Sequence, residues 1–99
     1  MSQDHPNRLR LDGTTTLRFP NHVKFRYDET RGRWVVLAPE RLLLPDEPAV
    51  EILKLVDGEH SVAAIIDDLV RRFEAPREVI ATDVTALLQD LVDKGVLAP

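Results

Sequence analysis

The stretch PERLLLPDE, residues 39–47, is the starting point for predicting the fold of the chain. Three consecutive leucines lie between two prolines, in a run that is too short for a helix. An extended run points successive side chains to opposite faces, so Leu43 must face away from Leu42 and Leu44. Prolines at both ends are typical of an edge strand. The stretch therefore predicts a short edge strand that is apolar on both faces, and it raises the question of what covers the second face.

Two further strands are predicted on the N-terminal side of this stretch. In HVKFRYD, residues 22–28, apolar side chains alternate with polar ones, which is the pattern of a half-buried strand. The segment WVVLA, residues 34–38, is apolar throughout and ends at Pro39. Gly32 lies between the two segments and favours a hairpin turn. The three segments together predict an antiparallel sheet.

Beyond Pro45 the hydrophobic period changes from two to 3.6 residues, which predicts helices. Asp46 is a suitable N-cap for a first helix, Ser61 caps a second, and Pro76 fits the start of a third. We expect the core positions of the three helices to be Ala49, Ile52, Leu53 and Val56; Val62, Ile65, Ile66, Leu69 and Phe73; and Ile80, Val84, Leu87, Leu88 and Leu91. The order predicts an α+β winged helix-turn-helix, with a three-stranded antiparallel sheet followed by a three-helix bundle.

The N-terminal residues carry little hydrophobic pattern. In residues 1–17 only Leu9, Leu11 and Leu17 could attach the segment to a core. Turn-forming and polar residues fill the remainder, which is typical of a mobile arm. A length of 99 residues suits one domain. We therefore predict a flexible arm at residues 1–17 and one folded domain at residues 18–99.

The composition argues against catalysis and metal binding. The chain has no cysteine, which excludes a thiolate metal site and a cysteine nucleophile. Its three histidines are scattered, and no glycine-rich phosphate loop or nucleophile elbow is present. We expect no catalytic residue, no metal and no cofactor. Because the sequence shows neither a membrane-spanning run nor a secretory signal, we expect a cytoplasmic protein without a membrane partner.

The charges are divided unevenly along the chain. Residues 1–45 hold eight Lys or Arg against five Asp or Glu, and residues 46–99 hold five against twelve. The expected third helix is itself acidic, with Arg77 and Lys94 against four carboxylates. An acidic recognition helix would be repelled by phosphates, so we expect no nucleic-acid partner. A DNA-binding winged-helix regulator is kept as the alternative.

Two elements are suited to binding an extended peptide. The edge strand offers unpaired backbone groups beside apolar side chains, the arrangement used for strand addition. A face of the third helix outside its core stripe is apolar at two positions. The expected peptide-binding residues are Arg41, Leu42, Leu43 and Leu44 on the strand, and Val79, Asp83, Ala86 and Asp90 on the helix. Basic residues on the strands favour an acidic peptide, and these residues are Lys24, Arg26, Arg33 and Arg41. The alternative is that the protein's own helices and N-terminal arm cover both leucine faces.

The run PERLLLPDEPAVEILKLVDGEHSVAAIIDDLVRRF, followed by DVTALLQDLVDKGVLAP, resembles the PqqD family of coenzyme PQQ synthesis proteins. The resemblance rests on the order of the elements and short motifs. These are a Pro-Glu strand, a helix with E-I-L, a D-G turn, a second helix, then D-V and a closing G-x-L. RFPNHVKFRYDETRGRWVVLAPE also fits the strands of the family. Two features depart from the family pattern. The third helix lacks a polar cap, and LAPERLLLP lacks the aromatic and the glycine that often flank Pro-Glu.

The resemblance implies a function without catalysis. PqqD-like domains bind the leader region of the precursor peptide PqqA and present it to the radical SAM enzyme PqqE, which cross-links a glutamate to a tyrosine. In related domains the peptide adds as a strand beside the third strand and lies against the third helix, the two elements named above. A recognition domain for another ribosomal peptide pathway, or an interaction domain docked to another enzyme, is the alternative. We expect a monomer, with a dimer through the edge strand or the N-terminal arm as the alternative.

Overall fold

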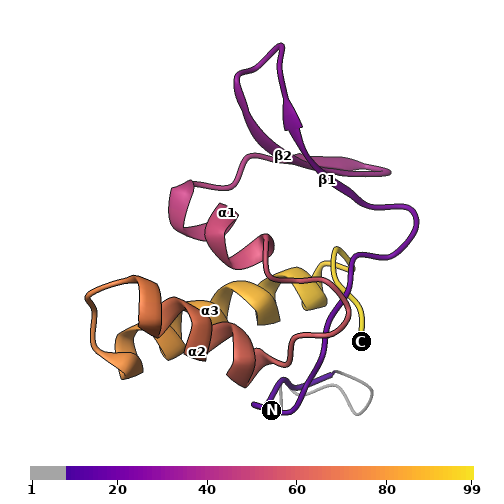
Figure 1. Ribbon diagram of the computed structural model, residues 1–99. Coiled ribbons are helices and arrows are strands. Elements are labelled where there is room, and N and C mark those ends of the chain that lie inside the picture. Colours follow the sequence, from indigo (N-terminus) through magenta and orange to yellow (C-terminus); the bar gives the residue numbers. More distant parts are fainter. Residues whose placement is uncertain (1–8) are drawn as a thin grey trace, which may run out of the picture.

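The computed structural model describes residues 9–99 and consists of a small sheet followed by three helices (Figure 1). The elements are β1 (Lys24–Asp28), β2 (Arg33–Ala38), β3 (Arg41–Leu43), α1 (Glu47–Leu53), α2 (Val62–Arg72) and α3 (Arg77–Asp93). The strands are antiparallel and lie in the order β1-β2-β3. Figure 1 shows α1 directly below the sheet, with α2 and α3 below α1. The predicted fold class and order of elements are confirmed.

The hairpin between β1 and β2 is closed by one carboxylate and one glycine. The carboxylate of Asp28 accepts hydrogen bonds from the backbone N–H groups of Thr30 and Arg31, at 2.9 and 3.2 Å. Gly32 has a φ of 68°, in the left-handed region that side chains disfavour. Its N–H donates to the Asp28 carbonyl at 2.7 Å. This local chemistry fixes the register in which β1 and β2 pair.

Side-chain and backbone caps define where the helices begin. The Asp46 carboxylate accepts from the N–H of Ala49 at 3.0 Å, and the Ser61 hydroxyl accepts from the N–H of Ala64 at 3.1 Å. Both predicted N-caps are therefore confirmed. At the start of α3, Pro76 forms no side-chain capping bond, as the missing polar cap indicated.

One continuous apolar core joins the inner face of the sheet to the helices. Each fully buried aliphatic side chain in it contributes about 1.5–3 kcal/mol relative to exposure. The buried members are Leu17, Val23, Val36, Ile52, Leu53, Val56, Val62, Ile65, Ile66, Leu69, Val84, Leu88, Leu91, Val96 and Leu97. Most of the expected helical stripe is present, with Ile80 and Leu87 partly buried against the cluster.

Phe73 is the exception to the expected stripe. Its side chain is 45% exposed, because α2 ends at Arg72 and Phe73 already has extended backbone angles of −122° and 144°. A residue that has left the helix no longer follows its 3.6-residue period. The prediction that Phe73 completes the core stripe is wrong.

The N-terminal segment is packed where the structure describes it. The carbonyls of Gly13 and Thr15 accept from the first two N–H groups of α2, those of Ala63 and Val62, at 3.0 and 2.8 Å. These are donors that a helix cannot satisfy internally. Leu17 is 1% exposed and belongs to the core. The predicted flexible arm therefore does not hold at residues 9–17, and residues 1–8 lie outside the described part of the chain.

The glutamine of α3 holds the beginning of this segment. The Gln89 amide donates to the Leu9 carbonyl at 2.8 Å and accepts from the Leu11 N–H at 3.1 Å. At the other end of the segment, the backbone groups of Arg18 pair with those of Ala98, close to the C-terminus. The helices in residues 9–99 are all too short or too polar to cross a membrane.

Candidate functional site

The outer edge of β3 is the first candidate surface. β3 is the last strand of the sheet and pairs only with β2 within residues 9–99, with Val36 opposite Leu43 and Leu37 opposite Leu42. On an edge strand, every second residue directs its backbone groups away from the sheet. The edge is therefore able to accept another strand.

The leucines of β3 divide between the two faces as the alternation predicts. Leu43 packs, partly buried, against the core cluster. Leu42 and Leu44 are 40% and 47% exposed. In the described residues, neither the helices nor the N-terminal segment covers these two side chains fully. The second face is open at these two leucines, which answers the question that the three leucines raise.

Arg33 on β2 occupies the backbone at the end of β3. Its Nη2 donates to the carbonyl oxygens of Leu44 and Pro45, both at 3.1 Å. The Leu44 carbonyl is thus already engaged, and Leu44 lies just beyond β3, which ends at Leu43. β3 itself spans Arg41–Leu43, so Leu44, the fourth predicted strand residue of the peptide site, lies just outside the strand. Sequence reasoning gave Arg33 only an electrostatic role.

The predicted face of α3 is exposed at all four positions. Val79 is 49% exposed, and Asp83, Ala86 and Asp90 are also exposed. Asp90 is paired with Lys94 at 2.8 Å, one helical turn further on. The buried positions of α3 lie on its other side, at Val84, Leu88 and Leu91. The four residues therefore form an exposed surface row, with two carboxylates beside two apolar side chains.

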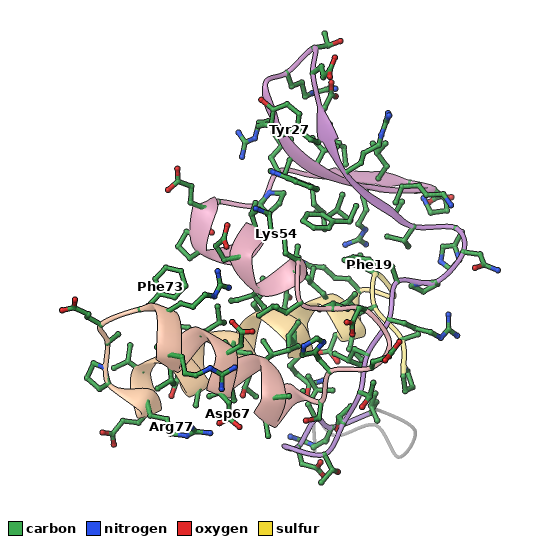
Figure 2. All side chains as sticks on the ribbon, viewed as in Figure 1. Phe19, Tyr27, Lys54, Asp67, Phe73 and Arg77 are labelled. Atoms are coloured by element: carbon green, nitrogen blue, oxygen red, sulfur yellow. The ribbon has the colours of Figure 1, made fainter. Side chains whose placement is uncertain are left out.

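A cleft of about 910 Å³ begins where the chain leaves β3. It runs from the hairpin past α1 to α2 and α3, and Figure 2 shows Tyr27 on the hairpin above α1 and Phe73 below it. Of the eight predicted site residues only Asp83 lines it. Apolar and aromatic side chains form much of its wall, among them Tyr27, Trp34, Pro45, Pro48, Val50, Phe73 and Ile80. Sequence reasoning missed this cleft because its wall comes from segments far apart in the chain.

Aromatic stacking shapes the hairpin side of the cleft. The ring of Trp34 lies 4.8 Å from that of Phe25 and 6.0 Å from that of Tyr27. The ammonium of Lys54, the residue that caps the end of α1, lies 5.2 Å from the Trp34 ring, within the range of a cation–π contact. Phe19 extends the stack at 5.5 Å from Phe25. These contacts attach the sheet to α1 and leave Tyr27, 48% exposed, at the rim.

An ion-pair network adjoins the cleft, where Glu51 and Lys54 form part of the lining. Glu51 on α1 accepts from Arg72 at 3.2 Å and from Lys54 at 3.3 Å, and Arg72 also donates to Asp68 at 2.8 Å. The bonds from Arg72 and then Lys54 lower the pKa of Glu51 below its ordinary value. The Arg72 guanidinium also lies 5.4 Å from the Phe73 ring. Because these charges are paired with one another, the cleft presents mainly apolar surface to a ligand.

The described residues offer no ready metal centre. Residues 9–99 contain no group of three or more His, Asp or Glu side chains placed to hold an ion. His60 is bonded to Asp57 at 2.8 Å in the turn before α2, where the pair serves local structure.

Residues 33–97 match the family model for coenzyme PQQ synthesis protein D, PqqD. The chain belongs to the PqqD family. A PqqA binding protein of Rhodopseudomonas palustris strain TIE-1 is 55% identical over 92 residues, which are 93% of this chain and 90% of that protein. The PqqA binding protein of strain BisB5 is 63% identical over 78 residues, covering 79% and 76%. The bifunctional coenzyme PQQ synthesis protein C/D of Methylorubrum extorquens is 40% identical over 87 residues, 88% of this chain and 23% of that protein.

Solved structures show the same fold. The PqqD truncation of Methylobacterium extorquens PqqCD, a functional and stand-alone RiPP recognition element, superposes with a TM-score of 0.74 at 38% identity, covering 90% of this PqqD-family chain and 95% of that one. PqqD from Xanthomonas campestris has a TM-score of 0.58 at 32% identity and covers 100% and 99%. Lasso peptide synthetase B1, complexed with the leader peptide, shares the fold alone, with a TM-score of 0.73 at 21% identity over 86% and 100%.

Proposed function

We propose that this PqqD-family chain is a peptide-binding chaperone of pyrroloquinoline quinone biosynthesis, which binds the PqqA precursor peptide. The free edge of β3, with Leu42 and Leu44 exposed beside it, is the observation that supports this most directly. The relatives named PqqA binding protein support the identity of the peptide. A recognition element for another ribosomal peptide is the alternative, and it differs in the leader sequence that it prefers.

The peptide pairs with Arg41–Leu43 of β3 as a fourth strand. A three-residue edge provides two or three backbone hydrogen bonds, each with a net contribution of about 1 kcal/mol. Ordering a disordered peptide costs about 2–5 kcal/mol or more, so these bonds alone do not produce a stable complex. Apolar side chains of the peptide must therefore be buried, at about 1.5–3 kcal/mol each.

Two described surfaces supply that burial. The exposed row of α3 offers Val79 and Ala86, and the cleft beyond Pro45 offers Phe73. Because Pro45 lies two residues beyond the end of β3, a strand paired with β3 has its neighbouring residues at the mouth of the cleft. We infer that the peptide combines strand addition with apolar anchors on α3 and in the cleft.

The chain carries out no chemistry in this proposal. It holds the peptide and presents it to a PqqE-like radical SAM enzyme. Basic side chains of the strands that form no ion pair within residues 9–99 favour acidic residues in the peptide. Lys24, Arg26 and Arg41 take this role rather than Arg33, whose guanidinium is bonded to backbone carbonyls.

A titration of the isotope-labelled protein with a synthetic PqqA-like peptide tests the proposal. We expect the largest amide shift changes at residues 41–43 and along residues 79–90. Ala86→Arg places a long side chain on the exposed row and should weaken binding about tenfold or more, equivalent to about 1.4 kcal/mol. Asn21→Arg, exposed in the turn before β1 and outside both proposed contact surfaces, adds the same charge and is the matched control.

Two results would overturn the proposal. The first is a folded Ala86→Arg variant that binds as tightly as the wild type, with shift changes away from β3. The second is tighter binding of a leader peptide from an unrelated ribosomal pathway, which would assign the same site to another precursor.

A further inference from the structure

Two basic side chains of β1 differ from those of the helices, because they form no ion pair with the residues that the structure describes. Within residues 9–99, all the basic side chains of the helical half lie in ion pairs: Lys54, Arg71, Arg72, Arg77 and Lys94. Lys24 and Arg26 on β1 are exposed and form no side-chain hydrogen bond or ion pair with the described residues. One strand therefore carries two free cations close together.

Both cations lie on the face of the sheet that is turned away from the core. They alternate along β1 with Phe25, whose ring stacks between those of Phe19 and Trp34 on the side of α1. Alternation along a strand places Lys24 and Arg26 on the opposite face. Figure 1 shows α1, α2 and α3 all on one side of the sheet.

Apolar side chains continue this face across the sheet. In the strand register Lys24 is opposite Leu37, which is opposite Leu42, so the three form one cross-strand row. Arg26 is opposite Val35 in the next row, and Val35 is fully buried although it faces away from the core cluster. Leu42 is 40% exposed. The surface made by Lys24, Arg26, Leu37 and Leu42 is called the outer sheet face below.

We propose that the outer sheet face docks an acidic amphipathic helix of a protein partner. Lys24 and Arg26 are two residues apart, about 6.8 Å along a strand, and carboxylates one turn apart on a helix are about 5–6 Å apart. Leu42 is two strands away from Lys24, about 10 Å across the sheet, which equals the diameter of one helix with its side chains. One helix with carboxylates on one flank and leucines on the other therefore meets both parts of the face.

The small number of free cations favours a protein partner over nucleic acid and over a membrane surface. Nucleic-acid affinity depends on neutralising many phosphates, and two free cations provide little of that energy. Recognition of an anionic membrane surface relies on clusters of about 4–8 basic residues. The docking shares Lys24, Arg26 and Leu42 with the proposed peptide contacts, but it uses the face of the sheet opposite to the core, while peptide addition uses the edge of β3.

The test is a titration of the full chain with a designed probe. The probe is a synthetic helical peptide of about 18 residues with Glu pairs one turn apart on one flank and Leu on the other. A second peptide with Lys in place of Glu is its control. We expect the acidic peptide alone to shift the amides of Lys24, Arg26, Leu37 and Leu42, and to bind more weakly as salt rises.

Charge reversal separates specific docking from general attraction. Replacing both cations, K24E together with R26E, should weaken binding of the acidic peptide about tenfold or more, because each reversal replaces an attraction by a repulsion. Arg71→Glu is the matched control, since Arg71 is 70% exposed on α2 and only 3.9 Å from Asp68 at the edge of pairing distance. Circular dichroism establishes that each variant is folded, and Arg26→Glu alone replaces the double variant if that one is unfolded.

Four results would overturn the inference. They are equal binding of the Lys-substituted peptide, shift changes confined to α2 and α3, undiminished binding by the folded charge-reversed variant, and the absence of shifts with the acidic peptide.

Binding of the wild type to phosphatidylserine vesicles but not to the peptide would assign the face to a membrane surface. Self-association in sedimentation that is lost in the charge-reversed variant would assign it to a second copy of the chain. Binding of the PqqA-like peptide, measured in parallel, reports on the proposed function separately.

Discussion

The Arg33 guanidinium on β2 holds the Leu44 carbonyl at the end of β3, with Nη2 at 3.1 Å from the oxygen. The same nitrogen donates to the Pro45 carbonyl at 3.1 Å. The two bonds set the direction in which the chain leaves β3 before Asp46 caps α1. Both bonds lie at Leu44 and Pro45, the corner of the chain between the free edge of β3 and the cleft. Arg33 thereby positions the proposed peptide site without belonging to its edge.

Arg33→Met should weaken binding of the PqqA-like peptide more than it lowers stability. The side chain keeps its length but loses both donors, so the corner after β3 is no longer held. Because the bonds are exposed, the free energy of unfolding should fall by only about 1 kcal/mol. Arg71→Met, which removes an exposed contact with Asp68 on α2 and does not line the cleft, is the control. Urea unfolding and peptide titration measure the two effects, and equal affinity for both variants would contradict the positioning role.

Phe73→Ala should reduce peptide affinity while leaving the fold nearly as stable as before. The Phe73 ring is 45% exposed at the cleft, so its removal leaves little cavity in the core. Leu69→Ala, one turn earlier on α2 and 4% exposed, should cost about 2–5 kcal/mol of stability. Thermal unfolding and peptide titration of both variants separate the two roles. A large loss of stability in Phe73→Ala would instead place the ring in the core.

Gln89→Ala should release the beginning of the N-terminal segment from α3. The substitution removes the bonds to Leu9 and Leu11, which are partly buried and contribute about 1 kcal/mol each. Amide hydrogen exchange at Leu11 should quicken, and the free energy of unfolding should fall by about 1–2 kcal/mol. Thr82→Ala, an exposed position on the same helix, should change neither quantity. Unchanged exchange at Leu11 in the Gln89 variant would show that other contacts hold the segment.

The turn before α2 should lose stability in acid. Hydrogen bonds from the backbone N–H groups of His60 and Glu59 hold the pKa of Asp57 at about 2, below its ordinary 3.8. A carboxyl with a lowered pKa stabilises the fold above its unfolded value, and this contribution is lost as pH falls through the folded value. The loss should therefore develop between about pH 4 and pH 2.

Asp57→Asn keeps an acceptor for the turn but cannot titrate. In the variant, no carboxyl at position 57 titrates between about pH 4 and pH 2. The free energy of unfolding should therefore fall less steeply over this pH range than in the wild type. Carbon-detected NMR titration of the Asp57 carboxyl gives its pKa directly. A midpoint near the ordinary value of 3.8 would show that the turn does not hold the carboxylate as described.

Local chemistry in the sequence determined the elements and their order. Alternation marked β1, the prolines bounded β3, and Asp46 and Ser61 indicated the starts of α1 and α2. These signals work because period, capping and turn formation depend on residues a few positions apart. The core stripe followed from the same period, except at Phe73, where α2 ends one residue earlier.

Only the tertiary structure decided the features that join distant segments. The carbonyls of Gly13 and Thr15 accept hydrogen bonds from the first N–H groups of α2, and the Arg33 guanidinium donates to the Leu44 carbonyl. Every residue carries a backbone carbonyl, so no sequence pattern shows which carbonyl will be used. The cleft likewise depends on the packing of the hairpin against three helices. The sequence predicted that the leucines alternate between the two faces of the sheet. Whether Leu42 is exposed to solvent depends on which face the helices cover. That choice is made by the summed burial of the core, a property of the whole fold.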